Sequence, residues 1–130
     1  MEQKFLIADD DPVVRLILTA ILESLGHSSD AVESGSACIE EVTKRISTQS
    51  PPRIIFLDHL LQDMSGLDVL AELRRLTASA PIPVIMLSSN SKEEILELSP
   101  QVTPDYFLEK PFRSETVAAA IAEVLKTESC

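Results

Sequence analysis

The chain has 130 residues, of which 45% are hydrophobic and 25% are charged. This length and composition are typical of one soluble globular domain, and they exclude a disordered chain, a collagen and a disulfide-rich miniprotein. The formal net charge is −10, from 21 acidic and 11 basic residues. Such a field repels nucleic-acid phosphates, so we expect no direct nucleic-acid binding and instead a metal cation or a basic partner surface.

No apolar run approaches the roughly 18 residues that a membrane span needs, so we expect no membrane insertion and no cleaved leader. Cys38 and Cys130 fit no metal-binding or redox spacing. We interpret Cys38 as a small buried apolar residue and Cys130 as a terminal thiol in a reducing compartment. The expected location is the cytoplasm.

Strand-like and helix-like segments alternate along the chain. In chain order, the expected elements are a strand at 4–8, a helix at 12–25, a strand at 28–32, a helix at 36–46, a strand at 53–57, a helix at 65–76, strands at 83–87 and 106–108, and a helix at 114–126. Asp11 and Ser114 are expected helix caps, and Gly26 is expected to end the first helix. The expected core positions of the four helices are Val14, Leu18, Ile21 and Leu25; Ile39, Val42 and Ile46; Leu67, Leu70 and Leu73; and Val117, Ile121 and Leu125.

Residues 92–98 have a helical pattern for about two turns, which Pro100 and Pro104 end. A fourth helix should therefore be short or distorted. Strands that are apolar on both faces and separated by helices favour an α/β fold, with a parallel sheet covered by helices on both sides. No linker or internal repeat interrupts the pattern, so we expect residues 1–130 to form a single domain.

Polar residues follow four of the five strands, at the edge where an open parallel sheet binds ligands. They are Asp9, Asp10 and Asp11 after the first strand, Asp58 after the third, Ser88 and Ser89 after the fourth, and Lys110 after the fifth. Clustered carboxylates repel one another unless a cation or a proton intervenes, and ligands that are all oxygen favour Mg²⁺. Asp58 is the natural nucleophile for an acyl phosphate, with Ser88 and Lys110 as partners of the phosphoryl oxygens. We interpret Asp11 as a helix cap rather than a metal ligand.

Four motifs in this order resemble the receiver domain of two-component response regulators over essentially the whole chain. They are FLIADDDP at 5–12, IIFLD at 54–58, PVIMLS at 83–88 and KPF at 110–112. The resemblance implies a flavodoxin-like doubly wound fold, with a five-stranded parallel sheet in the order 2-1-3-4-5.

The resemblance also implies a role for each matching residue. Asp58 matches the phosphoacceptor, and the implied Mg²⁺ ligands, for which Mn²⁺ can substitute, are Asp10, Asp58, Asp9 acting largely through water, and the Leu60 backbone carbonyl. Ser88 matches the switch hydroxyl, Phe107 the aromatic switch position, and Lys110 the lysine that precedes a cis proline, here Pro111. With no hydroxyl to hold it at the surface, Phe107 is expected to sit inward for part of the time.

The chain departs from the family pattern in places. Gln62 stands where the family has a proline, and no Gly-Ala turn precedes the fifth strand. His59 is interpreted as a surface loop residue and His27 as part of the turn after the first helix. Neither histidine has a partner at ligand spacing, so neither supports zinc.

The resemblance implies a phosphoacceptor switch that a histidine kinase or a histidine phosphotransfer domain phosphorylates and that a downstream protein target recognises. Its expected activities are Mg²⁺-dependent self-phosphorylation from the donor and autodephosphorylation, rather than enzymatic turnover. The alternatives are a pseudo-receiver that works without phosphate and a Mg²⁺-dependent phosphohydrolase, which would need an acid–base residue at the position of Leu60. The short stretches outside the predicted elements suggest a stand-alone receiver or an excised piece of a longer protein.

The first helix is apolar beyond its core stripe. Val13, Leu16, Ile17 and Ala20 cannot all face the sheet together with that stripe, so we expect a surplus apolar face beside the acidic residues that can dock a helical phosphodonor. The alternative is ordinary scattered surface exposure.

Overall fold

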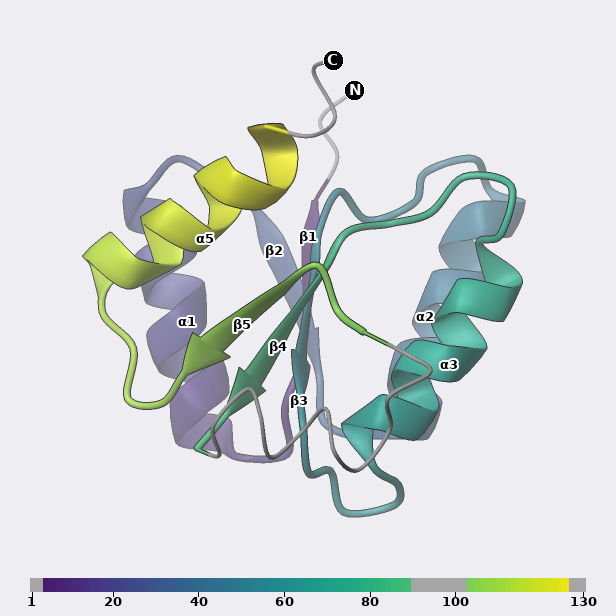
Figure 1. Cartoon of the computed structure of the whole chain (residues 1–130), viewed down its shortest axis with the longest axis horizontal. Coiled ribbons are helices and arrows are strands. Elements are labelled where there is room, and N and C mark those ends of the chain that lie inside the picture. Colours follow the sequence, from purple (N-terminus) through teal and green to yellow (C-terminus); the bar gives the residue numbers. More distant parts are fainter. Residues whose placement is uncertain (1–3, 90–102, 127–130) are drawn as a thin grey trace.

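The computed structural model describes residues 4–89 and 103–126, and these residues form a parallel sheet with helices on both faces (Figure 1). The elements are β1 (Phe5–Ala8), α1 (Pro12–Ser24), β2 (Ser29–Val32), α2 (Gly35–Ser47), β3 (Ile55–Asp58), α3 (Gly66–Leu76), β4 (Val84–Ser88), β5 (Tyr106–Glu109) and α5 (Ser114–Lys126). All neighbouring strands pair in parallel, in the order β2-β1-β3-β4-β5. The predicted fold class and strand order are confirmed, and the predicted fourth helix lies outside the described residues.

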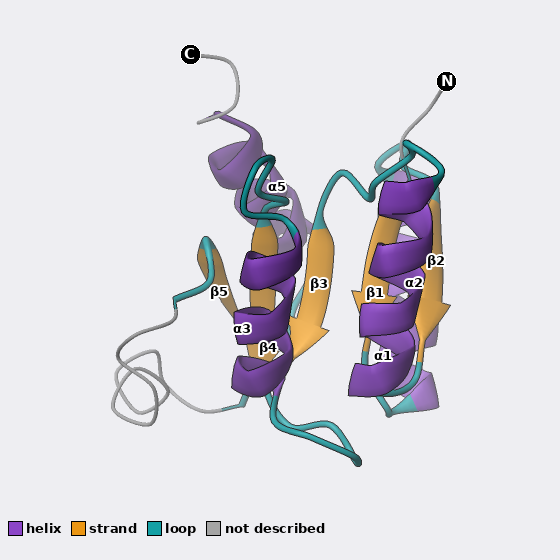
Figure 2. Cartoon of the chain, turned by 90° about the vertical axis from the view of Figure 1, so that its right-hand side faces the viewer, coloured by secondary structure: helices purple, strands orange, loops and turns teal. Residues whose placement is uncertain are grey.

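Successive side chains of the buried strands point to opposite faces of the sheet, and this divides the core into two apolar clusters. One cluster lies between the sheet and helices α2 and α3, and it includes Leu6, Ala8, Ile55, Leu57, Val84 and Met86. The other lies between the sheet and helices α1 and α5, and it includes Phe5, Ile7, Phe56, Ile85 and Leu87. The views in Figures 1 and 2 show the two helix pairs on opposite faces. Because both faces are covered, these strands are apolar throughout.

The predicted core stripes are confirmed for α3 and mostly for α5, and they need correction in the other two helices. In α1 the fully buried side chains are Leu18 and Leu22, so Leu22 was missed. In α2 the predicted core residue Ile46 is 37% exposed. It lies in the last turn, where it borders a small surface pocket instead of the sheet. Helical spacing indicates which side of a helix is apolar, but the position of the sheet decides how far along the helix burial extends.

The ends of the helices follow the sequence signals with one exception. Asp11 caps α1 by accepting a hydrogen bond from the Val13 N–H at 2.9 Å, and Gly26 (φ 89°) adopts the left-handed conformation that glycine allows after that helix. Ser114 was predicted to cap α5 but is its first helical residue. The N–H of Arg113, the residue before it, donates a hydrogen bond to Thr116 Oγ1 at 2.9 Å. The Thr116 hydroxyl is therefore the side-chain acceptor at this end of the helix.

Two further residues behave as the sequence indicates. Cys38 is fully buried, and burial raises the pKa of its thiol to about 12. His27 lies in the turn after α1, where its ring stacks on Phe5 with ring centres 4.6 Å apart. None of the helices in the described part of the chain has the length and apolar character to span a membrane.

Candidate functional site

The carboxyl ends of four strands meet at one edge of the sheet (Figure 2). Asp9 follows β1, Asp58 ends β3, Ser88 ends β4 and Lys110 follows β5. Strand pairing aligns these positions, since Asp58 is the register partner of Leu87, and Ser88 that of Glu109. The parallel topology therefore brings together residues from opposite halves of the chain, as the strand-end pattern predicts.

Lys110 joins the two buried carboxylates of this edge. Its Nζ lies 3.1 Å from Asp9 Oδ2 and 3.2 Å from Asp58 Oδ1. Asp9 is fully buried and Asp58 is 6% exposed, so each needs a compensating charge. The other oxygen of Asp9, Oδ1, accepts a hydrogen bond from the Asp11 N–H at 2.9 Å, which fixes the orientation of the Asp9 carboxylate.

Asp10 completes an acidic cluster with these two residues. Asp9, Asp10 and Asp58 each offer a carboxylate oxygen, and the three oxygens lie within 4.8 Å of one another. A single cation can contact oxygens at this spacing, and a donor set of oxygens alone suits a hard cation such as Mg²⁺. Asp11, whose side chain caps α1, is outside this cluster, as the sequence indicates.

Burial and the neighbouring charges have opposing effects on the pKa values of Asp58 and Lys110. Burial and the nearby charge of Asp9 raise the pKa of Asp58 to about 6, although Lys110 and the Leu60 N–H act against the rise. For Lys110, burial favours the neutral amine, but the charges of Asp58 and Asp9 outweigh burial and raise its pKa. The ammonium ion therefore stays charged, while one carboxylate of the cluster is poorly compensated.

A polar pocket of about 160 Å³ opens beside Asp58 and Lys110, and its other lining residues are His59, Leu60, Ser88 and Ser89. Ser88 is 5% exposed, so its side chain belongs to the pocket wall rather than to the outer surface. The pocket is therefore lined by the carboxylate, hydroxyl and ammonium groups that the sequence analysis expects at a phosphoryl site.

His59 corrects one interpretation, because it is 3% exposed and not a surface loop residue. Its N–H donates to the Leu87 carbonyl at 2.9 Å, so the backbone continues the pairing of β3 with β4 beyond Asp58. Burial lowers the pKa of His59, and its Nδ1 has no hydrogen-bond partner among residues 4–89 and 103–126.

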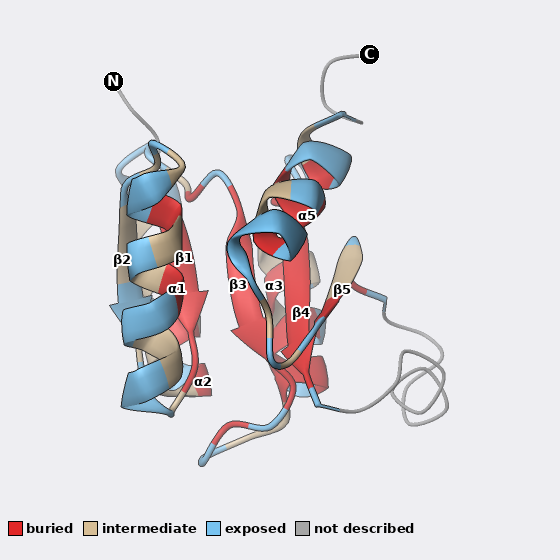
Figure 3. Cartoon of the chain, turned by 90° about the vertical axis from the view of Figure 1, so that its left-hand side faces the viewer, coloured by how far each residue is buried: buried red, intermediate tan, exposed pale blue. Residues whose placement is uncertain are grey.

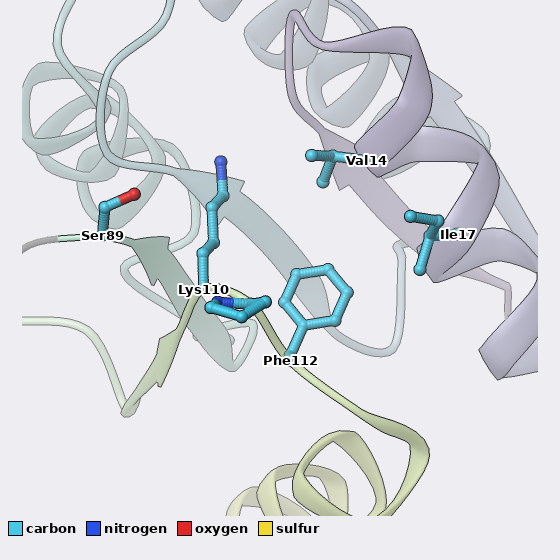
Figure 4. A pocket seen from close by; sticks show the side chains of 6 residues that line it. Val14, Ile17, Ser89, Lys110 and Phe112 are labelled. Atoms are coloured by element: carbon cyan, nitrogen blue, oxygen red, sulfur yellow. The ribbon is translucent and has the colours of Figure 1, made fainter.

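A second, mostly apolar pocket of about 270 Å³ lies next to the acidic edge, between α1 and the segment after β5 (Figure 4). The Phe112 ring faces Val14 and Ile17 across this pocket, and the Lys110 side chain passes along its other side. The Lys110–Pro111 peptide bond is cis, as the resemblance implies.

The remaining predicted residues occupy the surroundings of the edge. Leu60 is 63% exposed and lines the polar pocket beside Asp58. Phe107 is partly buried and packs against the core cluster on the side of α2 and α3.

Sequence reasoning missed two residues of the segment after Asp58. At Gly66 an added Cβ would lie 2.2 Å from the Asp58 carbonyl oxygen, so only glycine allows α3 to begin against the end of β3. The available signal was a glycine at the start of an otherwise strong helix. Asp63 accepts hydrogen bonds from the N–H groups of Gly35 and Ser36, across the loops, and no local pattern indicates such a contact.

Comparison with known proteins agrees with this geometry. The model of the family described as the response regulator receiver domain matches residues 5–122. The chain belongs to this family. It is 28% identical over 126 residues to the DNA-binding response regulator MtrA of Mycolicibacterium smegmatis, covering 97% of this chain and 52% of MtrA. It is 27% identical to the chemotaxis protein CheY of Halobacterium salinarum, covering 96% of this chain and 98% of CheY.

Among solved structures, a sensor protein from Polaromonas sp. JS666 superimposes with a TM-score of 0.84 at 26% identity, covering 98% of each chain. The chain spans about half the length of MtrA, and 5% of a histidine kinase that it also matches. The receiver is a phosphoacceptor module of two-component signalling, and the family is typically not a classical enzyme. Neither alternative function is favoured by these relatives.

Proposed function

We propose that this receiver domain accepts its phosphoryl group on Asp58 from a histidine kinase or a histidine phosphotransfer domain. The observation that carries the proposal is the Lys110 ammonium group, which lies 3.1 Å from Asp9 and 3.2 Å from Asp58 at the edge of a polar pocket. An Asp58 carboxylate oxygen attacks the donor phosphorus, and the bond from phosphorus to the donor atom breaks. The leaving group keeps that electron pair and takes a proton from solvent.

The acidic cluster fits Mg²⁺, with Mn²⁺ as a substitute. The residues that would hold it are Asp10 and Asp58 through their carboxylates, Asp9 largely through water, and Leu60 through its backbone carbonyl. A bound magnesium ion neutralises charge that develops on the transferring phosphoryl group. The same ion would offset the burial and the nearby Asp9 charge that raise the pKa of Asp58.

Two side chains are proposed to hold the phosphoryl oxygens. Lys110 supplies a fixed positive charge, and the Ser88 hydroxyl supplies a hydrogen-bond donor from the pocket wall. When Ser88 turns toward phosphate, the ring of Phe107 moves into the space that it leaves. Phosphorylation is then a local change of charge that biases a two-state element and so alters the surface that a downstream protein target binds.

The chemistry that we propose stops at self-phosphorylation from the donor and autodephosphorylation. A phosphohydrolase needs a side chain that can move protons beside the nucleophile, and the residue two places after Asp58 is Leu60, whose side chain is apolar. We further propose that residues 1–130 act as one receiver domain.

The donor protein is proposed to dock on α1. Val13, Leu16 and Ile17 are 59%, 71% and 45% exposed, and Figure 3 shows the outward side of α1 exposed beside the buried strands. Ile17 also lines the apolar pocket next to Lys110 (Figure 4). This face therefore continues from the helix surface to the acidic edge, where a helical donor has to present its phosphohistidine.

The test uses acetyl phosphate, which needs no docking surface. Incubation with Mg²⁺ should add ~80 Da, the mass of one phosphoryl group, to the intact protein. The Asp58→Asn variant should show no adduct, and chelation of the metal should suppress the adduct in the unmodified chain. Full labelling of Asp58→Asn at a different residue would contradict the assignment.

A further inference from the structure

The loop between β3 and α3, residues 59–65, is closed by its own backbone contacts. The Gly66 N–H donates to the His59 carbonyl at 2.6 Å, and the Leu61 N–H donates to the Met64 carbonyl at 3.2 Å. Leu60 and Ser65 form an antiparallel bridge between these two bonds. The loop therefore behaves as a small hairpin that begins directly after Asp58 and carries Leu60 on its first arm.

The far end of this loop is attached to α2 through Asp63. Asp63 Oδ1 accepts a hydrogen bond from the Gly35 N–H at 2.8 Å, and Oδ2 accepts one from the Ser36 N–H at 3.0 Å. These donors belong to the first turn of α2, where backbone N–H groups have no partner within the helix and the helix dipole favours a negative charge. The same two bonds lower the pKa of Asp63.

An apolar contact reinforces the attachment. A Cβ placed on Gly35 would lie 2.4 Å from Met64 Cγ and 2.8 Å from Val69 Cγ2. Only a glycine lets the start of α2 pack this closely against the loop and against α3. Asp63 and Met64 therefore contact the same helix end, one through hydrogen bonds and the other through packing.

We propose that Asp63 is a positioning residue that ties the β3–α3 loop to α2 and so holds the Leu60 backbone at the acidic edge. This inference rests on the proposed function, in which the Leu60 carbonyl is a metal ligand. Position 62 is a glutamine, so no proline ring restricts the backbone of the loop there. The hydrogen bonds between Asp63 and the start of α2 restrain the same loop through a contact with another element.

The first experiment measures Mg²⁺ affinity by calorimetric titration of the full chain. Asp63→Ala is expected to weaken Mg²⁺ binding by about 10-fold, the lower end of the range for residues that orient metal ligands. Ser34→Ala is the matched control, because Ser34 caps the same helix by accepting from the Ala37 N–H at 3.1 Å but has no hydrogen bond to the loop. Asp68→Asn, at an exposed position in the first turn of α3, controls for the loss of one negative charge. Both controls are expected to change the affinity less than 2-fold, on the order of a surface substitution.

The second experiment needs no metal and follows amide hydrogen exchange in each variant. Asp63→Ala should lose protection at the Leu61 amide inside the loop, whereas Ser34→Ala should keep it. Equal affinities and equal Leu61 exchange in Asp63→Ala and Ser34→Ala would overturn the inference. If the unmodified chain failed to bind Mg²⁺ or to be labelled, the proposed function would fail, and the metal-free exchange would still decide whether Asp63 holds the loop.

Discussion

The apolar interior and the acidic edge of this receiver domain are both buried, but they affect stability in opposite directions. In the interior, residues such as Leu22 and Phe56 remove apolar surface from water, which is the main favourable contribution to folding. At the edge, Asp9 and Asp58 are buried beside each other, and the raised pKa of Asp58 shows that ionising it is unfavourable there. The edge concentrates the charges that phosphoryl transfer needs, and the interior supplies the stability that keeps them together.

The largest effect is expected in the interior. Leu22→Ala should lower the free energy of unfolding by about 3 kcal/mol, since it leaves a cavity in the cluster between the sheet and helices α1 and α5. Urea denaturation measures this loss. Labelling by acetyl phosphate should persist in the folded variant, because Leu22 lies in the last three residues of α1 and not at the acidic edge. A folded variant that had lost labelling would show that the two regions are not separable.

An intermediate effect of the opposite sign is expected at the edge. In the metal-free protein, Asp58→Asn should raise the free energy of unfolding by about 1 to 2 kcal/mol at pH 7, after allowance for screening by solvent. The pKa of Asp58 is about 6 in the folded protein and near 3.8 when unfolded, so the folded state binds this proton more tightly. Ionisation therefore costs stability above pH 6, and the advantage of the variant should shrink as the pH falls from 6 to 4.

This prediction is checked by chemical denaturation of both proteins at several pH values in the presence of a chelator. Taking the difference between the two proteins removes the contributions of the other titrating groups. An advantage of Asp58→Asn that stayed constant from pH 7 to pH 4 would mean that the carboxylate charge is not its cause.

The smallest effect on stability is expected on the outer face of α1. Leu16 is 71% exposed, so Leu16→Glu should change the free energy of unfolding by no more than about 0.5 kcal/mol. Transfer from the cognate donor protein should slow, while labelling by acetyl phosphate should stay nearly unchanged. Equal slowing of both reactions would show that this face supports the edge itself and would refute the docking proposal.

Much of the fold and part of the site could be predicted because their signals are local. The buried strands are uninterrupted apolar runs, and Asp9, Asp10, Asp58 and Lys110 each stand within two residues after the end of a predicted strand. The strand order came from the resemblance to the receiver family. His59 follows the third strand and was predicted to lie on the surface, but it is buried beside β4, a contact with a strand distant in the sequence.

By itself, the sequence determined the alternation of elements, the chemical groups at the strand ends and the surplus apolar residues of α1, because each depends on neighbouring residues and a regular period. Only the tertiary structure decided which apolar residues are buried, as Leu22 and Ile46 show, since burial depends on where the sheet lies against each helix. It also decided the close approach at Gly66 and the contact of Asp63 with α2. These contacts join backbone groups to residues elsewhere in the chain. Every residue except proline carries a backbone N–H, so the sequence does not indicate which one a given side chain binds.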